Sequence, residues 1–184
     1  MANQGSDATL NDAAGDKIRD WLQLTKNGHG PLKEGEKASS LAYMYALQQD
    51  WMVSVMPFLD VQSATASANT ASITFTYTVQ PQHCNRLHHL HGGATATLLD
   101  FCTSVPLSLV SRPGFWQYLG VSRCLTVSYL RPARAGDQVL IETEIVQVGK
   151  RLATLRGSIR RKEDRQLLCT AEHLKVNIDS AVSL

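Results

Sequence analysis

The chain has 184 residues, 43% of them hydrophobic and 18% charged, and a formal net charge of +2. This length suits one domain with a sizeable core, and the nearly balanced charge lacks the basic excess of a nucleic-acid-binding protein. No stretch approaches the ~18 consecutive apolar residues that span a bilayer, so we expect no membrane insertion. The cysteines are widely spaced, and the N-terminus resembles neither a secretion signal nor a mitochondrial presequence. We therefore expect reduced thiols and a cytoplasmic location.

The N-terminal part of the chain differs in character from the rest. Residues 1–15 are rich in Ala, Asn, Asp, Gly and Ser, a composition typical of disorder. Apolar side chains then fall at helical spacing in 16–26 and again in 41–55, until a proline ends the second run. We therefore predict an N-terminal extension over 1–56, partly disordered and then helical, and a single domain over 57–184.

The domain combines strand patterns with one long apolar helix. The segment TASITFTYTVQ alternates apolar side chains on one face with threonines on the other, which is typical of a half-buried strand. A helix is predicted from Gly92 towards Ser111, with a kink or an end at Pro106. The predicted strands cover about residues 58–66, 71–80, 120–131, 138–149, 151–162 and 166–177.

The segment HCNRLHHLHGGATATLLD, from His83 to Asp100, places an asparagine, a His-Gly-Gly step and one acidic residue where a loop becomes a helix. Two glycines at a helix start let a ligand approach the backbone and leave unpaired N–H groups pointing outwards. Such an end favours negative charge, including charge that develops only in a transition state. The pattern is therefore typical of an acyl-transfer or hydrolysis site without a conventional nucleophile.

Asp100 is the one charged side chain between Gly92 and Ser111, and apolar residues flank it on both sides. A carboxylate there is costly to bury unless something uses or pairs it, so it is either functional or part of a structural ion pair. Asp100 lies eight residues beyond Gly92, which is roughly 12 Å along a helix axis. If both groups serve one reaction, the carboxylate has to come from a second copy of the chain, at a site shared across a two-fold axis.

With these segments and the later GVSRCLTVSYLRPAR, the chain resembles the hotdog-fold acyl-CoA thioesterases of the phenylacetate-pathway and thioesterase-superfamily-member-2 type. The resemblance covers about residues 58–178. It implies an α+β fold in which an antiparallel sheet of about six strands wraps around one long central helix. It also implies a dimer with shared active sites, usually paired into a homotetramer, that hydrolyses an acyl-CoA to a carboxylic acid and CoA in lipid metabolism.

The resemblance gives roles to matching residues in this chain. Asn85 matches a loop asparagine that hydrogen-bonds the substrate carbonyl or the water, and Gly92 matches the helix-start residue whose N–H polarises the thioester carbonyl. Asp100 matches the carboxylate that acts from the partner subunit as general base or orients the water. Ser122 matches a serine that helps to hold that water. The connection SRPGFWQYLG is a few residues longer than the family pattern, so the place of Ser122 depends on how this insertion packs.

The resemblance also places coenzyme A against the helix start, the strand end LRPARAG and a hairpin tip. Arginine suits phosphate groups through bidentate contacts. We interpret the further basic run of Arg160, Arg161 and Lys162 as a solvated surface cluster. No cofactor is expected besides the coenzyme A of the substrate. The predicted substrate- and CoA-binding residues are His91, Gly93, Tyr129, Arg131, Pro132, Arg134, Gly149, Lys150 and Arg151.

The histidine-rich loop also contains possible metal ligands and a possible cysteine nucleophile. The spacing of His83, Cys84, His88, His89 and His91 fits no standard zinc pattern, so we expect no metal. A nucleophile at Cys84 would lack an evident orienting partner.

Two other functions on the same fold stay open at this point. A module that binds acyl-CoA without turnover would not need the intact set of Asn85, Gly92 and Asp100. An enzyme for hydration or double-bond chemistry would want a histidine on the helix, and none lies between Gly92 and Ser111. The channel for the acyl group is expected to involve Leu98, Leu99, Phe101 and the aromatic insertion.

Overall fold

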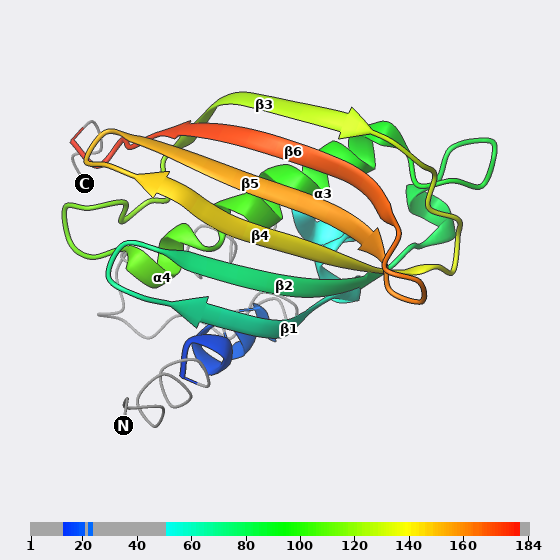
Figure 1. Ribbon diagram of the computed structural model, residues 1–184, viewed down its shortest axis with the longest axis horizontal. Helices are drawn as coiled ribbons and strands as arrows, with labels where there is room; N and C mark the ends of the chain where they lie inside the picture. Colours follow the sequence, from blue (N-terminus) through cyan, green and yellow to red (C-terminus); the bar gives the residue numbers. More distant parts are fainter. Residues whose placement is uncertain (1–12, 21, 24–50, 181–184) are drawn as a thin grey trace.

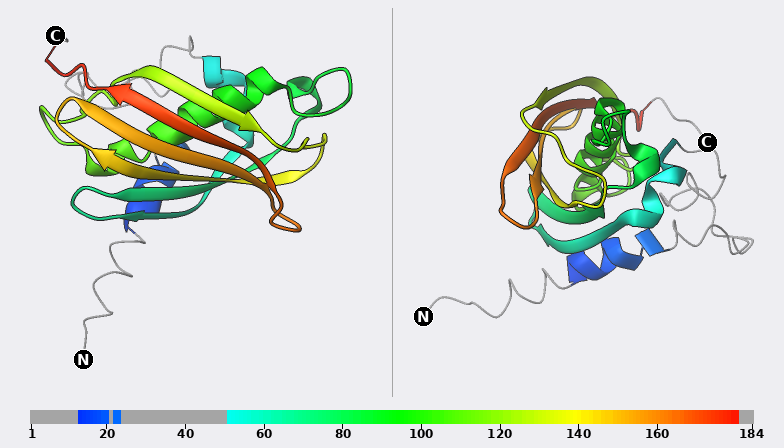
Figure 2. Two further views of the ribbon diagram at one scale, coloured as in Figure 1. Left: turned by 45° about the horizontal axis from the view of Figure 1, so that its top comes forward. Right: turned by 90° about the vertical axis from the view of Figure 1, so that its right-hand side faces the viewer.

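The computed structural model describes residues 13–20, 22–23 and 51–180. Within this part of the chain, one antiparallel sheet of six strands, in the order β1-β2-β4-β5-β6-β3, curves around helix α3, Gly92–Ser104 (Figure 1). The end-on view in Figure 2 shows the sheet wrapped around this helix. The predicted α+β architecture, one sheet around one central helix, is confirmed.

Each strand lies inside the range predicted for it, because alternation of apolar and polar side chains marks the two faces of a sheet. Strand β2 buries Ile73, Phe75 and Tyr77, while the residues between them are only half-buried. The strands are β1 (Leu59–Ala66), β2 (Ala71–Thr78), β3 (Val121–Tyr129), β4 (Gln138–Val148), β5 (Leu152–Arg161) and β6 (Leu167–Val176).

Helix α3 packs closely against the sheet at Gly157 of β5. A Cβ atom there would lie 2.7 Å from Thr103 Cγ2 and 3.0 Å from Leu99 Cδ2, so a larger residue would push the helix away. Leu98 and Leu99 are fully buried, and Phe101 is 7% exposed. These three side chains are therefore core residues of the helix.

The predicted break in the helix is confirmed: α3 ends at Ser104, and Pro106 separates it from α4, Leu107–Val110. The expectation that no stretch of the chain is apolar enough to span a bilayer is wrong for this segment. By length and composition, Gly92–Val110 is apolar enough to cross a membrane, because its serines and threonines do not offset its many apolar residues. In the fold, 61% of this window is buried inside the protein, as befits a helix that fills the core within a sheet.

The helical residues of the N-terminal extension, 13–20 and 22–23, agree with the first helix predicted there, as far as the described residues go. Ile18 and Leu22 are buried in the same hydrophobic cluster as the start of β1. Lys17 Nζ also donates a hydrogen bond of 3.2 Å to a carbonyl oxygen of α4. The extension thus contributes to the core of the sheet-and-helix domain.

Of the second helix predicted in the extension, residues 41–50 lie outside the described residues. The rest of that prediction is wrong. Two short 3₁₀ helices, η1 (Trp51–Ser54) and η2 (Met56–Phe58), replace an α-helix. Pro57 has no N–H group and cannot continue an α-helix, so the chain uses tighter turns to reach β1.

The insertion 111–120 closes the end of the sheet at which β3 begins. Trp116 is fully buried and its Nε1 donates a hydrogen bond of 2.7 Å to the Gly149 carbonyl. Gly120 has a φ of +62°, and a Cβ atom there would lie 2.3 Å from the Val176 carbonyl oxygen. Trp116 therefore packs inside this end of the sheet and connects the insertion that follows α4 to the β4–β5 hairpin.

Candidate active site

The loop before α3 is fixed by its own polar groups. Asn85 Oδ1 accepts hydrogen bonds from the backbone N–H groups of Leu87 (2.9 Å) and His89 (3.2 Å). The Leu90 N–H donates to the Ala133 carbonyl, which ties the loop to the segment after β3. In the described part of the chain the side-chain NH₂ group of Asn85 has no hydrogen-bond partner, so it can donate to a ligand.

The first turn of α3 leaves a hydrogen-bond donor unused. His91 caps the helix, since its Nδ1 accepts the Gly93 N–H at 2.9 Å, and its carbonyl accepts the Thr95 N–H. No residue in the described ranges accepts the Gly92 N–H. This N–H points along the helix axis at the positive end of the helix dipole, where developing negative charge is stabilised.

A cleft of about 310 Å³ opens at this helix start. Asn85, Gly92 and Tyr129 lie on its wall, and the Tyr129 hydroxyl donates a 2.9 Å hydrogen bond to the Gly92 carbonyl. Apolar and mostly buried side chains make the floor, which would receive a carbon chain better than a charged group. These floor residues are Leu90, Ala133, Ile159, Leu168 and Cys169.

The cleft does not include Leu98, Leu99 or Phe101, which were expected to line the acyl channel. It also includes no residue of the aromatic insertion, whose Trp116 is buried at the other end of the sheet. Their apolar character reflects packing of the core, which sequence patterns do not separate from a binding wall.

A second polar cluster surrounds Asp100, half of whose side chain is exposed in the single chain. The Ser122 hydroxyl lies 2.7 Å from Asp100 Oδ1. His173 Nε2 lies 2.9 Å from the Ser122 oxygen and 3.2 Å from Asp100 Oδ1. On its other side, His173 Nδ1 lies 2.7 Å from the Thr103 hydroxyl. Side chains from α3, β3 and β6 therefore meet at one carboxylate.

Charge and burial set the protonation of this second cluster. Burial and the nearby Lys175 ammonium lower the pKa of His173 to about 4, although the Asp100 carboxylate opposes this shift. Burial also lowers the pKa of Lys175, and Asp100 again acts in the opposite direction. Lys175 Nζ donates a 2.8 Å hydrogen bond to Ser104, which in turn donates to the Asp100 carbonyl. The Asp100 carboxylate therefore lies near the neutral imidazole of His173 and the buried amine of Lys175.

The structure does not bring the two clusters together within one chain. Asp100 and Ser122 are not among the residues of the cleft. Strand pairing sets Tyr129 opposite Cys169 at the cleft, whereas Ser122 lies opposite Lys175, further along β6. The carbonyl-binding groups and the carboxylate thus occupy different positions along the same helix and strand.

The predicted CoA-binding residues divide between two ends of the sheet. Tyr129, Arg131 and Pro132 line the cleft, with Arg134 two residues further on, and His91 and Gly93 stand at the helix start. Gly149, Lys150 and Arg151 form the β4–β5 tip at the opposite end, beside the buried insertion. Within one chain, the two groups therefore lie at different ends of the sheet.

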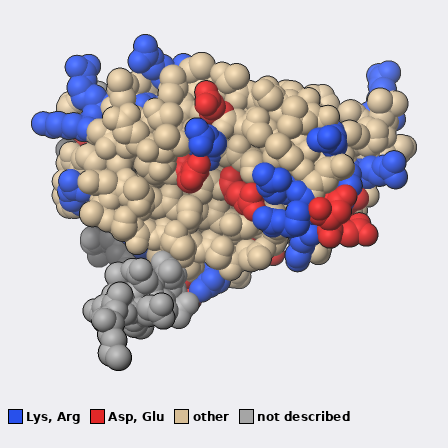
Figure 3. Space-filling model, viewed as in Figure 1, with Lys and Arg blue, Asp and Glu red and all other residues tan. Residues whose placement is uncertain are grey.

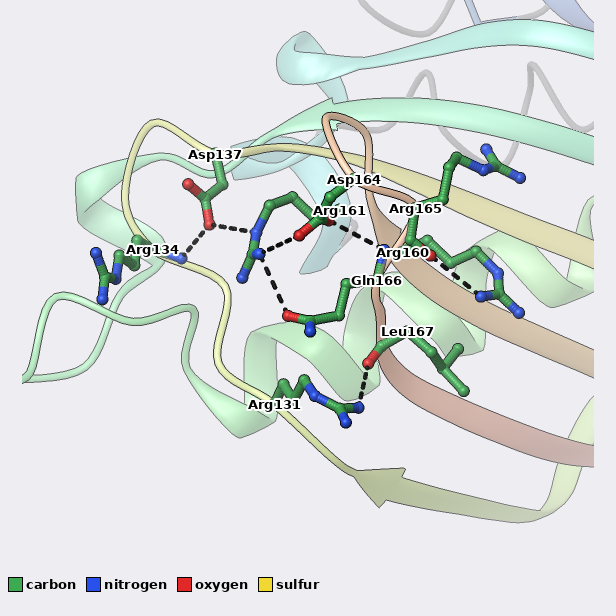
Figure 4. A network of polar contacts seen from close by, with 9 residues as sticks. All are labelled: Arg131, Arg134, Asp137, Arg160, Arg161, Asp164, Arg165, Gln166 and Leu167. Carbon is green, nitrogen blue, oxygen red and sulfur yellow. Dashed lines mark hydrogen bonds and ion pairs between the residues drawn. The ribbon is translucent and has the colours of Figure 1, made fainter.

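Charged residues of both signs gather at the cleft end of the sheet, as Figure 3 shows around the β5–β6 hairpin. Figure 4 shows Arg161 held between Asp137 and Asp164, the latter contact being 2.9 Å. Arg160 and Arg165 both contact the Glu142 carboxylate. The solvated-cluster interpretation of Arg160 and Arg161 agrees with these ion pairs.

Arg131 and Arg134 differ from these neighbours. The Arg131 guanidinium donates to the Leu167 carbonyl at 3.1 Å, and in Figure 4 the Arg134 guanidinium points away from the ion pairs. Neither pairs with a carboxylate in the described part of the chain. These two arginines therefore keep their charge available to an anion.

The histidine-rich loop does not gather a metal site: among the described residues, no three His, Cys, Asp or Glu side chains are placed to hold an ion. Burial raises the pKa of the Cys84 thiol, and its Sγ–H donates to the Gln80 carbonyl at 3.3 Å. Both properties oppose the thiolate that a nucleophilic cysteine needs. His83 instead contacts the Tyr77 hydroxyl at 2.5 Å, in the core.

Reasoning from the sequence missed His173, Thr103 and Lys175. A signal was present, because β6 alternates inward and outward positions, and Cys169, Ala171, His173 and Lys175 share the inward face. Two titratable side chains at inward positions of a strand mark a buried polar site.

Known proteins are similar to this chain in sequence and in fold. The sequence profile of the thioesterase superfamily matches residues 87–168. Acyl-coenzyme A thioesterase 13 of Mus musculus is 34% identical over 97 residues, which span 53% of this chain and 66% of that protein, slightly under two thirds of its length. Thioesterase superfamily member 2 of zebra fish has a similar fold, with a TM-score of 0.65 and 21% identity over 89% of this chain and 97% of its own.

A hypothetical thioesterase of Streptococcus pneumoniae, solved with coenzyme A, is also similar. Its TM-score is 0.55 at 20% identity, over 65% of this chain and 85% of that one. The profile, the curated relative and these folds agree with the resemblance seen in the sequence. Residues 87–168 match the thioesterase superfamily, and the chain has the hotdog fold of these structural neighbours.

Proposed function

We propose that this protein is an acyl-CoA thioesterase, which hydrolyses an acyl-CoA to a carboxylic acid and CoA without a resident cofactor. The observation that carries the proposal is the unused Gly92 N–H beside Asn85 at the head of an apolar cleft. These are donors for a carbonyl oxygen, and the chain also has a carboxylate with an attached hydroxyl at Asp100 and Ser122. A module that only binds thioesters would need no such carboxylate.

In the proposed reaction, the thioester carbonyl accepts hydrogen bonds from the Gly92 N–H and the Asn85 amide. Asp100 takes a proton from a water held by Ser122, and the water oxygen attacks the carbonyl carbon. The oxyanion that forms is stabilised by the helix start, a contribution whose loss typically costs ~10²–10³ in rate. The C–S bond then breaks, and the CoA thiolate leaves with little need for a strong acid.

Coenzyme A is supported as part of the substrate by the relative named as an acyl-coenzyme A thioesterase and by the structural neighbour solved with coenzyme A. Within this chain, the support is the free charge of Arg131 and Arg134 at the cleft mouth. Guanidinium groups bind phosphates through paired hydrogen bonds. We assign the nucleotide phosphates to this end of the cleft.

We further propose that two chains share each site. Strand β3 is the edge of the sheet next to β6, and its Val121 and Tyr129 are 49% and 56% exposed. If the β3 strands of two chains pair antiparallel across a two-fold axis, the end of one lies beside the start of the other. The Asp100 and Ser122 of one chain then approach the Gly92 cleft of the other.

The same pairing would bring the β4–β5 tip of one chain towards the arginines of the other, which joins the two sets of predicted CoA-binding residues. A dimer with two such sites is therefore the smallest active unit that we propose. Pairing of two dimers into a homotetramer follows from the family resemblance, and size-exclusion chromatography with light scattering distinguishes the two states.

The decisive experiment measures thiol release from acyl-CoAs of short, medium and long chain and from phenylacetyl-CoA. The wild type is compared with Asp100→Asn, which keeps the shape of the side chain and removes its basicity. We expect turnover to fall by ~10²–10⁴, the range for a lost general base, with substrate affinity retained. Binding without turnover by the wild type would instead make the protein a carrier or sensor, and neither binding nor turnover would refute both functions.

A further inference from the structure

The hydrogen-bond donors around His173 define which nitrogen of the ring carries a proton. The Thr103 hydroxyl donates its single proton to the Leu99 carbonyl at 2.6 Å, one helical turn earlier. Its oxygen therefore has to accept at the 2.7 Å contact with His173 Nδ1. A neutral His173 then has its proton on Nδ1, and its Nε2 is an acceptor.

The other side of the ring has too few protons for its contacts. Three heavy atoms meet there, namely Asp100 Oδ1, Ser122 Oγ and His173 Nε2, at separations of 2.7, 2.9 and 3.2 Å. With an ionised carboxylate and a neutral ring, the serine hydroxyl supplies the only hydrogen among them. One more proton would satisfy every contact, so the cluster is built to accept one.

We propose that Asp100, Ser122 and His173 accept the proton of the attacking water as one unit, and that Lys175 is the positioning residue that keeps this unit unprotonated beforehand. This inference rests on the proposed thioester hydrolysis. The O–H bond of the water breaks, its oxygen forms the new C–O bond, and its proton enters the unit through the Asp100 carboxylate. When the C–S bond breaks, the same proton passes to the CoA thiolate, which restores the unit.

Lys175 is suited to this role by its position. It is 6% exposed, and its one hydrogen bond to a side chain in the described ranges is to the Ser104 hydroxyl, not to a carboxylate. A buried amine without a paired carboxylate is costly, so its charge is expected to serve a purpose. Burial lowers the pKa of His173 most, and the charge of Lys175 lowers it further, so that the ring is neutral at physiological pH.

Among residues 51–180, no charged group other than Asp100 and Lys175 faces the ring from the elements packed against it. The residues paired with His173 on β3 and β5 are Leu125 and Leu155, and α3 contributes Asp100 and Thr103. Asp100 favours the protonated ring and Lys175 opposes it. Together with burial, which is the largest cause of the low pKa of His173, the balance between these two charges sets the pH at which the unit takes up a proton.

The test compares Lys175→Met with Lys175→Arg in the dependence of kcat/KM on pH. Removing the charge raises the pKa of His173, so the unit becomes protonated at a higher pH. The acid limb of the profile should therefore shift to higher pH by about one unit. Lys175→Arg keeps the charge and should leave the limb in place. Methionine matches the length of lysine, and replacing a buried charge with an apolar group is generally tolerated. A thermal melt checks folding.

A second measurement reports the protonation state of the His173 ring independently of activity. ¹⁵N NMR of labelled histidine, with His173 assigned by its loss in His173→Gln, should show a neutral ring protonated on Nδ1 near pH 7. Its protonation midpoint should rise in Lys175→Met. A proton on Nε2, or a midpoint and acid limb unchanged by Lys175→Met, would overturn the inference. If the wild type releases no thiol from any acyl-CoA, the proposed function fails, while the NMR result still decides the state of the ring.

Discussion

The cleft at the start of α3 and the cluster at Asp100 are built in different ways. The cleft depends on a continuous loop, in which Asn85 bonds residues two and four positions later. The cluster joins residues that are 22, 51 and 70 positions apart. A local motif can be identified from spacing alone, whereas the cluster exists only after the sheet has formed.

The two regions also use different sources of charge. The cleft offers backbone N–H groups and two exposed arginines to a ligand, and it needs little burial to do so. The cluster relies on a fully buried histidine and a buried lysine, whose effects are strong because water is excluded. The cleft suits binding and polarisation of a carbonyl, and the cluster suits removal of a proton.

The largest effect is expected from mixing two inactive variants. In the proposed shared site, the cleft comes from one chain and the Asp100 cluster comes from the other. Asn85→Ala and Asp100→Asn should each be nearly inactive alone. In a mixed dimer, one of the two sites receives both intact residues. Random exchange makes about half of the dimers mixed, so activity should return to about one quarter of the wild-type value.

Mixing is measured by thiol release after subunit exchange, which a tag on one variant verifies by co-purification. Mixing two preparations of Asp100→Asn is the matched control and should restore nothing. If mixed dimers form and stay inactive, the two regions do not act across the interface, and the site has to be assembled within one chain.

A smaller loss is expected from Gly92→Ala, which changes the cleft and spares the cluster. A Cβ atom at this position would lie 3.7 Å from the nearest atoms, those of the Tyr129 ring, so the fold should accept it. The same methyl group would stand where the substrate carbonyl approaches the N–H. We expect a loss in kcat/KM on the order of 10²-fold, as for a lost oxyanion donor, at an unchanged melting temperature.

Gly93→Ala provides the contrast. Its Cβ atom would lie 3.1 Å from His91 Nδ1, the atom that caps the helix, so this substitution should lower the melting temperature. If Gly92→Ala retained full activity, the helix start would not bind the carbonyl, and the proposed role of the cleft would have to be abandoned.

Most of the fold was predictable because its determinants are local. Alternation in β2 and the glycine and proline residues at turns gave strand ranges that enclose all the described strands. The helix start at Gly92 and the break at Pro106 followed from the same rules. The 3₁₀ turns before β1 were not predicted, since apolar spacing in a short segment does not distinguish an α-helix from a tighter turn.

The candidate site was predictable only where residues lie close in sequence. The resemblance drew attention to Ser122, and the fold then placed its hydroxyl beside Asp100 despite the longer insertion, because Trp116 and Gly120 take up the extra length. Nothing in the loop motif pointed to His173, which reaches the helix from the last strand. Its role depends on strand order, which the sequence alone did not define.

The smallest effect is expected at the mouth of the cleft, where charges are exposed and screened by salt. Arg131→Gln and Arg134→Gln should each raise KM for acyl-CoA by about 3- to 10-fold, the effect of one exposed charge-assisted contact. KM should not change for a pantetheine thioester, which lacks the nucleotide phosphates. Arg156→Gln is the matched control, because Arg156 carries the same charge but pairs with Glu144 away from the cleft. Equal effects on both substrates would mean that these arginines support the cleft and do not bind phosphate.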